Sequence, residues 1–108
     1  MNLQISGTIV STWYNVNGNA NTPSYKTYRY NSPTKVSASQ IRVNFTNDAC
    51  CSKGDRNLRV DKINIDGVDY QTEDPSVYSL GVWDSSSGCG PGYKQSEWLS
   101  CNGYFQYK

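Results

Sequence analysis

Apolar and polar residues alternate over short stretches of this chain, and no stretch keeps the spacing of an amphipathic helix. The clearest alternation runs from Gln40 to Phe45, where Ile41, Val43 and Phe45 fall on one face of a predicted strand. Clusters of Gly, Asn, Pro and Ser separate such stretches at short intervals. The pattern predicts an all-β, single-domain β-sandwich over residues 1–108.

The same pattern predicts further strands at Leu3 to Val10, Thr12 to Val16, Tyr25 to Tyr30, Leu58 to Asp66, Val68 to Gln71 and the C-terminal GYFQYK. Asp66-Gly67 is typical of a tight hairpin turn. In the strand before it, Leu58 and Val60 share one face, whereas Ile63 and Ile65 fall on the other. Either both faces are partly covered, or a bulge near Asp61 shifts the register.

Composition excludes several classes of function. Ten basic and nine acidic residues give a net charge of +1, so the chain lacks the basic footprint of a nucleic-acid-binding protein. No apolar run approaches the roughly 20 residues that span a bilayer, and we expect no membrane partner. The start, MNLQISGTIV, is not a signal peptide, so we expect a monomeric module cut from a larger protein.

Four cysteines allow three pairings, and the absence of histidine and of a C-x-x-C pair argues against zinc. Disulfides in a secreted protein fit better than free thiols in a cytosolic one. Cys89 and Cys101 bracket a Gly/Pro-rich loop, and closing a loop of that length contributes about 3 kcal/mol. We prefer this pairing, which leaves Cys50 and Cys51 as a vicinal pair; crossed pairings between the two segments remain open.

The segment between Phe45 and Asp66 concentrates oxygen donors. Asp48, Asp55, Asn57 and the backbone carbonyl of Arg56 can converge on one cation, and calcium takes six to eight such oxygens. The alternative is that these residues form Asx-turns and caps in a solvated loop.

A second acidic group arises from the predicted hairpin. If Asp66-Gly67 is a tight turn, Asp61 comes near Gln71 or Glu73 on the opposite strand. Two carboxylates brought close repel each other unless a proton or a cation joins them. A structural calcium is one resolution, and a salt bridge to Lys62 or Arg59, or simple exposure, is the other.

Aromatic residues beside loops suggest sugar binding, because their faces stack on the C–H faces of sugar rings. Trp83, in GVWDSSSG, and Tyr93, in GPGYKQ, have the polar surroundings of exposed platforms, and we include Asp84 as a carbohydrate-binding neighbour. Trp98 and Tyr104 are expected in the core.

We expect no catalysis. Without histidine, a Ser-His-Asp or Cys-His arrangement is excluded. A glycosidase needs two carboxylates across a cleft, and Asp84 with Glu97 is such a pair, but a small sandwich rarely forms a deep cleft.

The blocks FTNDA, GDRNLRVDKINIDGVDYQTEDP, GVW and CGPGYKQSEWLSCNGYFQY resemble the family 60 carbohydrate-binding modules, xylan-binding domains attached to bacterial glycoside hydrolases. The resemblance spans Gln40 to the C-terminus, and the N-terminal third matches only in general strand character. It implies a jelly-roll β-sandwich, related by circular permutation to family 36, and calcium-dependent recognition of xylan, with galactan or β-glucan as further ligands.

In that family a protein-bound calcium is completed by two neighbouring hydroxyls of one sugar while an aromatic ring stacks on the chain. Carried onto this sequence, the resemblance implies a sugar-binding calcium on Asp48, Asp55, Arg56 and Asn57. It also implies stacking platforms at Trp83 and Tyr93, and a structural calcium on Asp61, Gln71 and Glu73. It gives no reason for Cys50-Cys51 inside the metal loop.

The leading hypothesis is therefore a secreted, non-catalytic module that targets an attached glycoside hydrolase to plant cell-wall polysaccharide. The alternative is a structural or protein-interaction sandwich that calcium merely rigidifies.

Overall fold

The computed structural model describes residues 1–13, 27–46, 58–86 and 88–108. Within them the chain forms one short 3₁₀ turn, η1 (Ala38–Gln40), and a series of strands. The strands are β1 (Asn2–Ile5), β2 (Thr8–Thr12), β3 (Ile41–Phe45), β4 (Leu58–Arg59), β5 (Lys62–Ile65), β6 (Val68–Gln71), β7 (Tyr78–Leu80), β8 (Trp98–Leu99) and β9 (Gly103–Gln106). No helix among these residues has the length and apolar character needed to cross a membrane.

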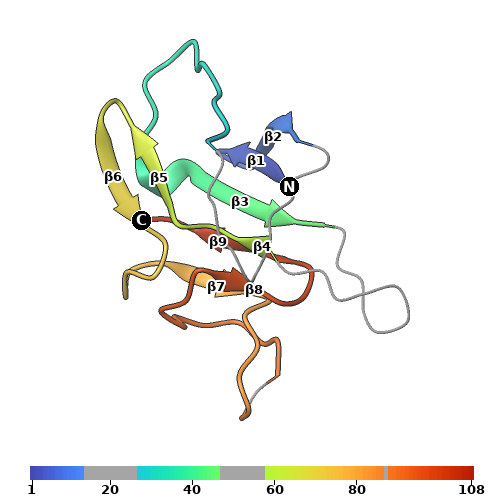
Figure 1. Cartoon of the computed structure of the whole chain (residues 1–108). Coiled ribbons are helices and arrows are strands. Elements are labelled where there is room, and N and C mark those ends of the chain that lie inside the picture. The colour runs from blue at the N-terminus through green and yellow to red at the C-terminus, as the bar shows by residue number, and fades with distance from the viewer. Residues whose placement is uncertain (14–26, 47–57, 87) are drawn as a thin grey trace.

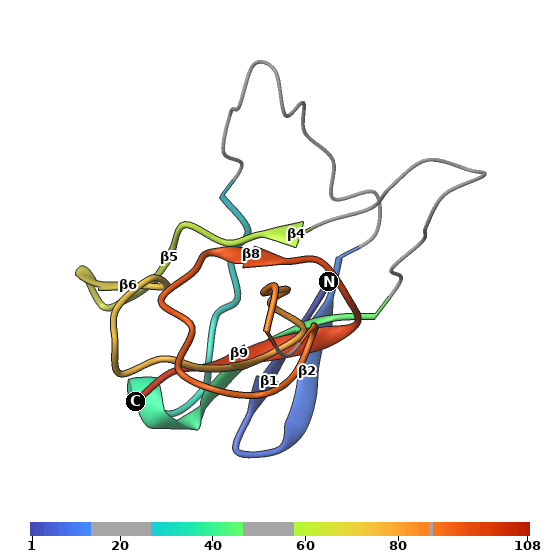
Figure 2. The ribbon, with the colours of Figure 1, turned by 90° about the horizontal axis from the view of Figure 1, so that it is seen from below.

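The strands form two layers (Figures 1 and 2). One layer is a five-stranded antiparallel sheet in the order β2-β1-β3-β9-β7. The other contains two antiparallel ribbons, β4-β8 and β5-β6. Figure 2 shows the ribbons lying over the sheet. The predicted all-β sandwich is confirmed.

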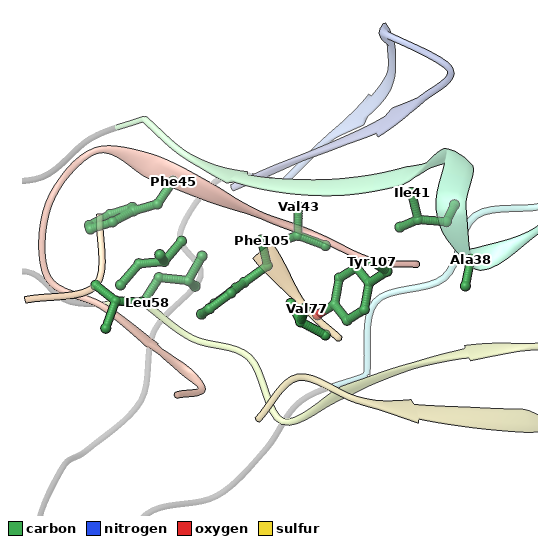
Figure 3. Packing of buried hydrophobic residues seen from close by; sticks show 10 residues of the cluster. Ala38, Ile41, Val43, Phe45, Leu58, Val77, Phe105 and Tyr107 are labelled. Carbon is green, nitrogen blue, oxygen red and sulfur yellow. The ribbon is translucent and has the colours of Figure 1, made fainter. Parts of the chain in front are cut away.

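The core lies between the layers (Figure 3). Ile41, Val43 and Phe45 of β3 are all buried, as their alternation predicts, and Phe105 of β9 pairs with Val43 across the sheet. From the ribbons, Leu58 and its cross-strand partner Leu99 are buried against them. Burying such side chains contributes roughly 1.5–3 kcal/mol each, which makes this layer contact the main source of stability.

The predicted strand Leu3 to Val10 is wrong as a single element. The chain turns at Ser6-Gly7, where both residues have positive φ angles of 52° and 84°, and β1 and β2 pair as a hairpin. The predicted strand Tyr25 to Tyr30 is also not found over its described part, residues 27–30. No described strand pairs with these residues, so an extended conformation there gains no stability from cross-strand contacts.

The change of face within Leu58 to Asp66 comes from a change of partner. Arg59 ends a pairing with β8, and Lys62 begins one with β6, so Val60 and Asp61 form the seam between the two ribbons. The Asp66-Gly67 hairpin is confirmed, with φ angles of 52° and 87° in the turn. β7 and β8 were not predicted, since two or three residues carry no clear alternation.

Candidate functional site

The loop predicted to hold the sugar-binding calcium falls outside the described residues. Its ligands and the vicinal cysteine pair all lie within residues 47–57: Asp48, Cys50, Cys51, Asp55, Arg56 and Asn57. These assignments therefore stay predictions. The flanks are described, because β3 ends at Phe45 and β4 begins at Leu58.

Three carboxylates meet at the seam between the ribbons. Asp61, Glu73 and Glu97 each place a carboxylate oxygen within 4.8 Å of the others. The backbone brings them there, because the Thr72 amide donates to the Asp61 carbonyl at 3.1 Å and the Val60 amide donates to the Glu97 carbonyl at 2.8 Å. The predicted approach of Asp61 and Glu73 is confirmed, whereas Glu97 comes from a distant segment that sequence reasoning did not connect to them.

One basic side chain and one buried hydroxyl pair adjoin this carboxylate cluster. Arg59 forms an ion pair with Glu97. Beneath the cluster, the buried hydroxyls of Thr72 and Tyr107 are hydrogen-bonded at 2.7 Å. Burial raises the pKa of the Tyr107 hydroxyl, and the negative charges of Glu73 and Asp61 add to that rise, while the bond to Thr72 opposes it.

The donor set suits a hard cation, because calcium is bound by carboxylate oxygens. Asp61 and Glu73 were predicted ligands of a structural calcium, and Glu97 adds a third carboxylate. The remaining predicted ligand, Gln71, is the cross-strand partner of Lys62 at the end of the hairpin. The two cations of the alternative salt bridge have other partners: Arg59 pairs with Glu97, and Lys62 pairs with Asp69.

Trp83, a predicted stacking platform, is exposed, with 61% of its surface accessible. It follows buried Val82 and Gly81, whose φ of 106° suits glycine. Gly81 has no room for a side chain, because a Cβ there would lie 2.7 Å from the Cys101 carbonyl oxygen. The backbone beneath Trp83 is therefore fixed by close packing.

A disulfide closes the loop below this platform. Cys89 and Cys101 are bonded, with their Cα atoms 6.3 Å apart, which confirms the preferred pairing. The Gly81 carbonyl accepts from the Cys101 amide at 3.1 Å, and the Gly81 amide donates to the Cys89 carbonyl at 3.3 Å. Both cysteines of the disulfide are thus hydrogen-bonded to Gly81, the residue that precedes Val82 and Trp83.

Tyr93, the second predicted platform, is also exposed, with 60% of its surface accessible, and its ring packs edge-on against that of Tyr78, with the ring centres 5.2 Å apart. Its neighbour Lys94 forms an ion pair with Asp84, the neighbour of Trp83. Asp84 also accepts bonds from the amide and hydroxyl of Ser86, at 2.8 Å each. Asp84 therefore ties the two aromatic segments together.

The core prediction for Trp98 is wrong, because 39% of its surface is accessible. Leu99, the next residue, takes the inward position, and alternation turns Trp98 outward, where it lies 5.1 Å from the Arg59 guanidinium. Tyr104 is half-buried on the outer face of the sheet, with the Arg42 guanidinium 3.8 Å from its ring centre. Neither ring belongs to the inter-layer core.

The two acids considered for a glycosidase, Asp84 and Glu97, lie in different ion pairs. Asp84 pairs with Lys94 and Glu97 pairs with Arg59, so each carboxylate is already engaged with its own cation. The two acids belong to different groups, the aromatic segment and the carboxylate cluster.

Comparison with known proteins decides the family. The model of the Ca-dependent, xylan-binding carbohydrate-binding module family CBM60 matches residues 1–80. The chain belongs to this family. A solved structure described as vCBM60 in complex with galactobiose is 35% identical, with a TM-score of 0.66, covering 98% of this chain and 84% of that one. The match from residue 1 extends the family likeness into the N-terminal third, beyond the expected Gln40 boundary.

The CBM60 module is also similar to a larger enzyme. It is 35% identical over 105 residues to the endo-1,4-beta-xylanase Xyn11B of Cellvibrio japonicus, covering 97% of this chain. The chain spans about a quarter of the length of that curated relative, since it covers 25% of it. As a member of a carbohydrate-binding family, the module is non-catalytic and binds carbohydrate.

Proposed function

We propose that this module binds plant cell-wall polysaccharide in a calcium-dependent manner and targets an attached, secreted glycoside hydrolase to it. Xylan is the principal ligand, with galactan or β-glucan as further ligands. The single observation that supports this most is membership of a family described as calcium-dependent and xylan-binding. The relative Xyn11B, a xylanase that is four times longer, supports the attached catalytic domain.

In the proposed mechanism, Asp48, Asp55, Asn57 and the carbonyl of Arg56 hold the sugar-binding calcium. Incomplete protein coordination leaves positions for two neighbouring hydroxyls of one sugar. Trp83 and Tyr93 offer rings to adjoining sugar units, and the Asp84–Lys94 ion pair sets their relative position. Because the calcium contacts only one pair of neighbouring hydroxyls, other polysaccharides that present a similar pair also bind.

We propose a separate structural calcium at the seam between the ribbons. Asp61, Glu73 and Glu97 supply its carboxylates, with Gln71 as a further oxygen donor from the end of β6. Supporting this, three carboxylates lie within 4.8 Å while only Glu97 has an ion-pair partner among the described residues. A calcium there joins β4-β8 to β5-β6.

Affinity electrophoresis in xylan, with and without EDTA, tests the function. We expect strong retardation with calcium and a large loss of retardation in EDTA. Undiminished retardation in EDTA would refute the calcium mechanism. Calcium-dependent melting without any sugar-dependent heat on isothermal titration would favour the structural sandwich instead.

A further inference from the structure

The outer face of the five-stranded sheet carries a depression lined by polar residues. It has a volume of about 240 Å³ and lies where η1 enters β3. Its wall consists of amides, hydroxyls, backbone and one guanidinium, and includes Gln4, Ser6, Ser39, Arg42 and Gln106. Neither a carboxylate nor an apolar side chain lines it. The depression therefore carries one positive charge and several hydrogen-bonding groups.

The strand register builds this wall. Gln4, Arg42 and Gln106 are cross-strand partners on three adjacent strands, β1, β3 and β9. Because Ile41 and Val43 point into the core, alternation turns Arg42 outward, and its partners share that face. Three adjacent strands span about 10 Å, so these side chains form one continuous row.

Arg42 is held in place before any ligand arrives. Its Nε donates to the Gln106 Oε1 at 3.2 Å, and its guanidinium lies over the Tyr104 ring. Gln106 is itself anchored, because its Nε2 donates to the backbone carbonyls of Ser39 and Ile41 at 3.0 Å each. These contacts leave the two terminal nitrogens of Arg42 for other partners.

The charge of Arg42 is not balanced locally. Among the described residues, its guanidinium forms no ion pair with a carboxylate. Neutral groups nearby are also available. The Gln4 side chain has no hydrogen-bond partner in the described part of the chain, and the Ser6 hydroxyl accepts from Gln40 at 2.9 Å while its own hydrogen stays free to donate.

We infer that this depression binds an acidic sugar, a hexuronic acid carried as a side group on the polysaccharide. The terminal nitrogens of Arg42 match the two oxygens of a carboxylate in a parallel, charge-assisted pair. Gln4 and Ser6 form hydrogen bonds with the hydroxyls of the sugar ring. The volume is below the roughly 300 Å³ at which pockets for larger ligands begin, so it suits one sugar ring rather than a chain.

This site includes none of the proposed calcium ligands. The depression lies at the Ile41 end of β3, whereas the loop follows Phe45 at the other end. The inference builds on the module's carbohydrate binding and requires no metal. Its outcome is therefore measured in EDTA, where the proposed calcium site is inactive.

The test is an NMR titration of the ¹⁵N-labelled module in EDTA with sodium glucuronate, glucose and sodium acetate. We expect glucuronate to shift the amides of Gly7, Ser39 and Gln106, and glucose and acetate to leave them nearly unchanged. Arg42→Gln should weaken glucuronate binding at least about tenfold, since it removes a charge-assisted pair. Arg29→Gln, which removes an exposed cation elsewhere, should bind as the parent does.

Three results would overturn the inference: equal shifts with acetate, equal shifts with glucose, or unchanged binding by Arg42→Gln. If Arg42→Gln does not fold, Gln4→Ala provides the second variant, and it should weaken glucuronate binding without altering the amide dispersion. Loss of xylan retardation in EDTA with glucuronate binding retained would separate this site from the calcium site. Retardation of the parent by glucuronoxylan should also exceed that by the same polymer after its carboxyl groups are reduced.

Discussion

The ion pair between Lys94 and Asp84 joins the two segments that carry the exposed rings of Tyr93 and Trp83. Each partner directly follows one ring in the sequence, so the pair links the two predicted platforms. Only about 0–1 kcal/mol of folding stability is expected from such a partly exposed pair.

The Asp84–Lys94 ion pair predicts that removing either partner weakens sugar binding to a similar degree. Asp84→Asn and Lys94→Gln should each weaken xylan binding several-fold, and the double variant should be no weaker than the worse single variant. Isothermal titration with a xylo-oligosaccharide in calcium measures this. If Lys94→Gln binds normally while Asp84→Asn does not, Asp84 contacts the sugar directly rather than through the pair.

Removing the Trp83 ring should weaken binding without unfolding the module. Trp83→Ala is expected to cost about 1–2 kcal/mol of binding free energy, a 5- to 30-fold loss, because a stacking face disappears. The control is Ile9→Ala on edge strand β2, which also removes an exposed apolar side chain, 54% accessible. Equal affinities for the two variants would move the platform role to Tyr93.

The carboxylate cluster predicts that calcium raises the melting temperature. Glu73→Gln should reduce this calcium-induced rise in melting temperature. In EDTA, the variant should melt at or above the temperature of the parent, because it relieves repulsion among Asp61, Glu73 and Glu97. Asp69→Asn serves as the control, since Asp69 is an exposed carboxylate that pairs with Lys62. An unchanged calcium increment in Glu73→Gln, measured by differential scanning calorimetry, would contradict the structural site.

Tyr107 predicts a loss of stability at alkaline pH. Its pKa in the folded protein is raised above the ordinary value of 10.0, mainly by burial, so the folded state keeps a proton that the unfolded state releases. The contribution of Tyr107 to the free energy of unfolding is fully present below pH 10. It falls as the pH rises further, by up to about 1.4 kcal/mol per pH unit.

Urea unfolding of the parent and of Tyr107→Phe between pH 8 and 11 measures this slope. The parent should lose stability above pH 10 more steeply than Tyr107→Phe, since the other titrating groups are common to both. At neutral pH the free energy of unfolding of Tyr107→Phe should be about 1 kcal/mol lower than that of the parent, because the hydrogen bond to Thr72 is lost. Parallel pH profiles would contradict the assignment.

Gly103 should tolerate no side chain. A Cβ at this position would lie 1.8 Å from the Leu80 carbonyl oxygen, in the pairing of β9 with β7. Gly103→Ala should therefore cost more than about 3 kcal/mol or prevent folding. Gly88→Ala, where no atom lies within 4 Å, should cost only the strain of its φ of 65°. Similar urea midpoints for both variants would refute this.

Local chemistry predicts part of this fold. Asp66-Gly67 defined the β5-β6 hairpin because its residues accept positive φ, and strict alternation defined β3. The same kind of turn at Ser6-Gly7 was missed, since the β-branched residues on either side resemble one continuous strand. The disulfide followed from loop length, which is also a local property.

Long-range contacts explain what the sequence did not reveal. Glu97 joins Asp61 and Glu73 only because β8 pairs with β4, and a two-residue strand leaves no recognisable pattern. Trp98 was expected in the core because it lies near the strand-like C-terminus, but its burial depends on which neighbour faces inward, and Leu99 takes that position. The pairing of Arg42 with Gln106 joins residues 64 positions apart.

The disulfide that brackets Gly81 has a consequence for where this protein matures. Because both cysteines hold the backbone beneath Trp83, the proposed stacking ring is supported by a covalent bond that forms only under oxidising conditions. A module made in a reducing compartment would have its sandwich core but a loosened recognition surface. If Trp83 stacks on the sugar as proposed, oxidation of this disulfide is a maturation step for ligand recognition, and protein produced under reducing conditions should bind sugar more weakly.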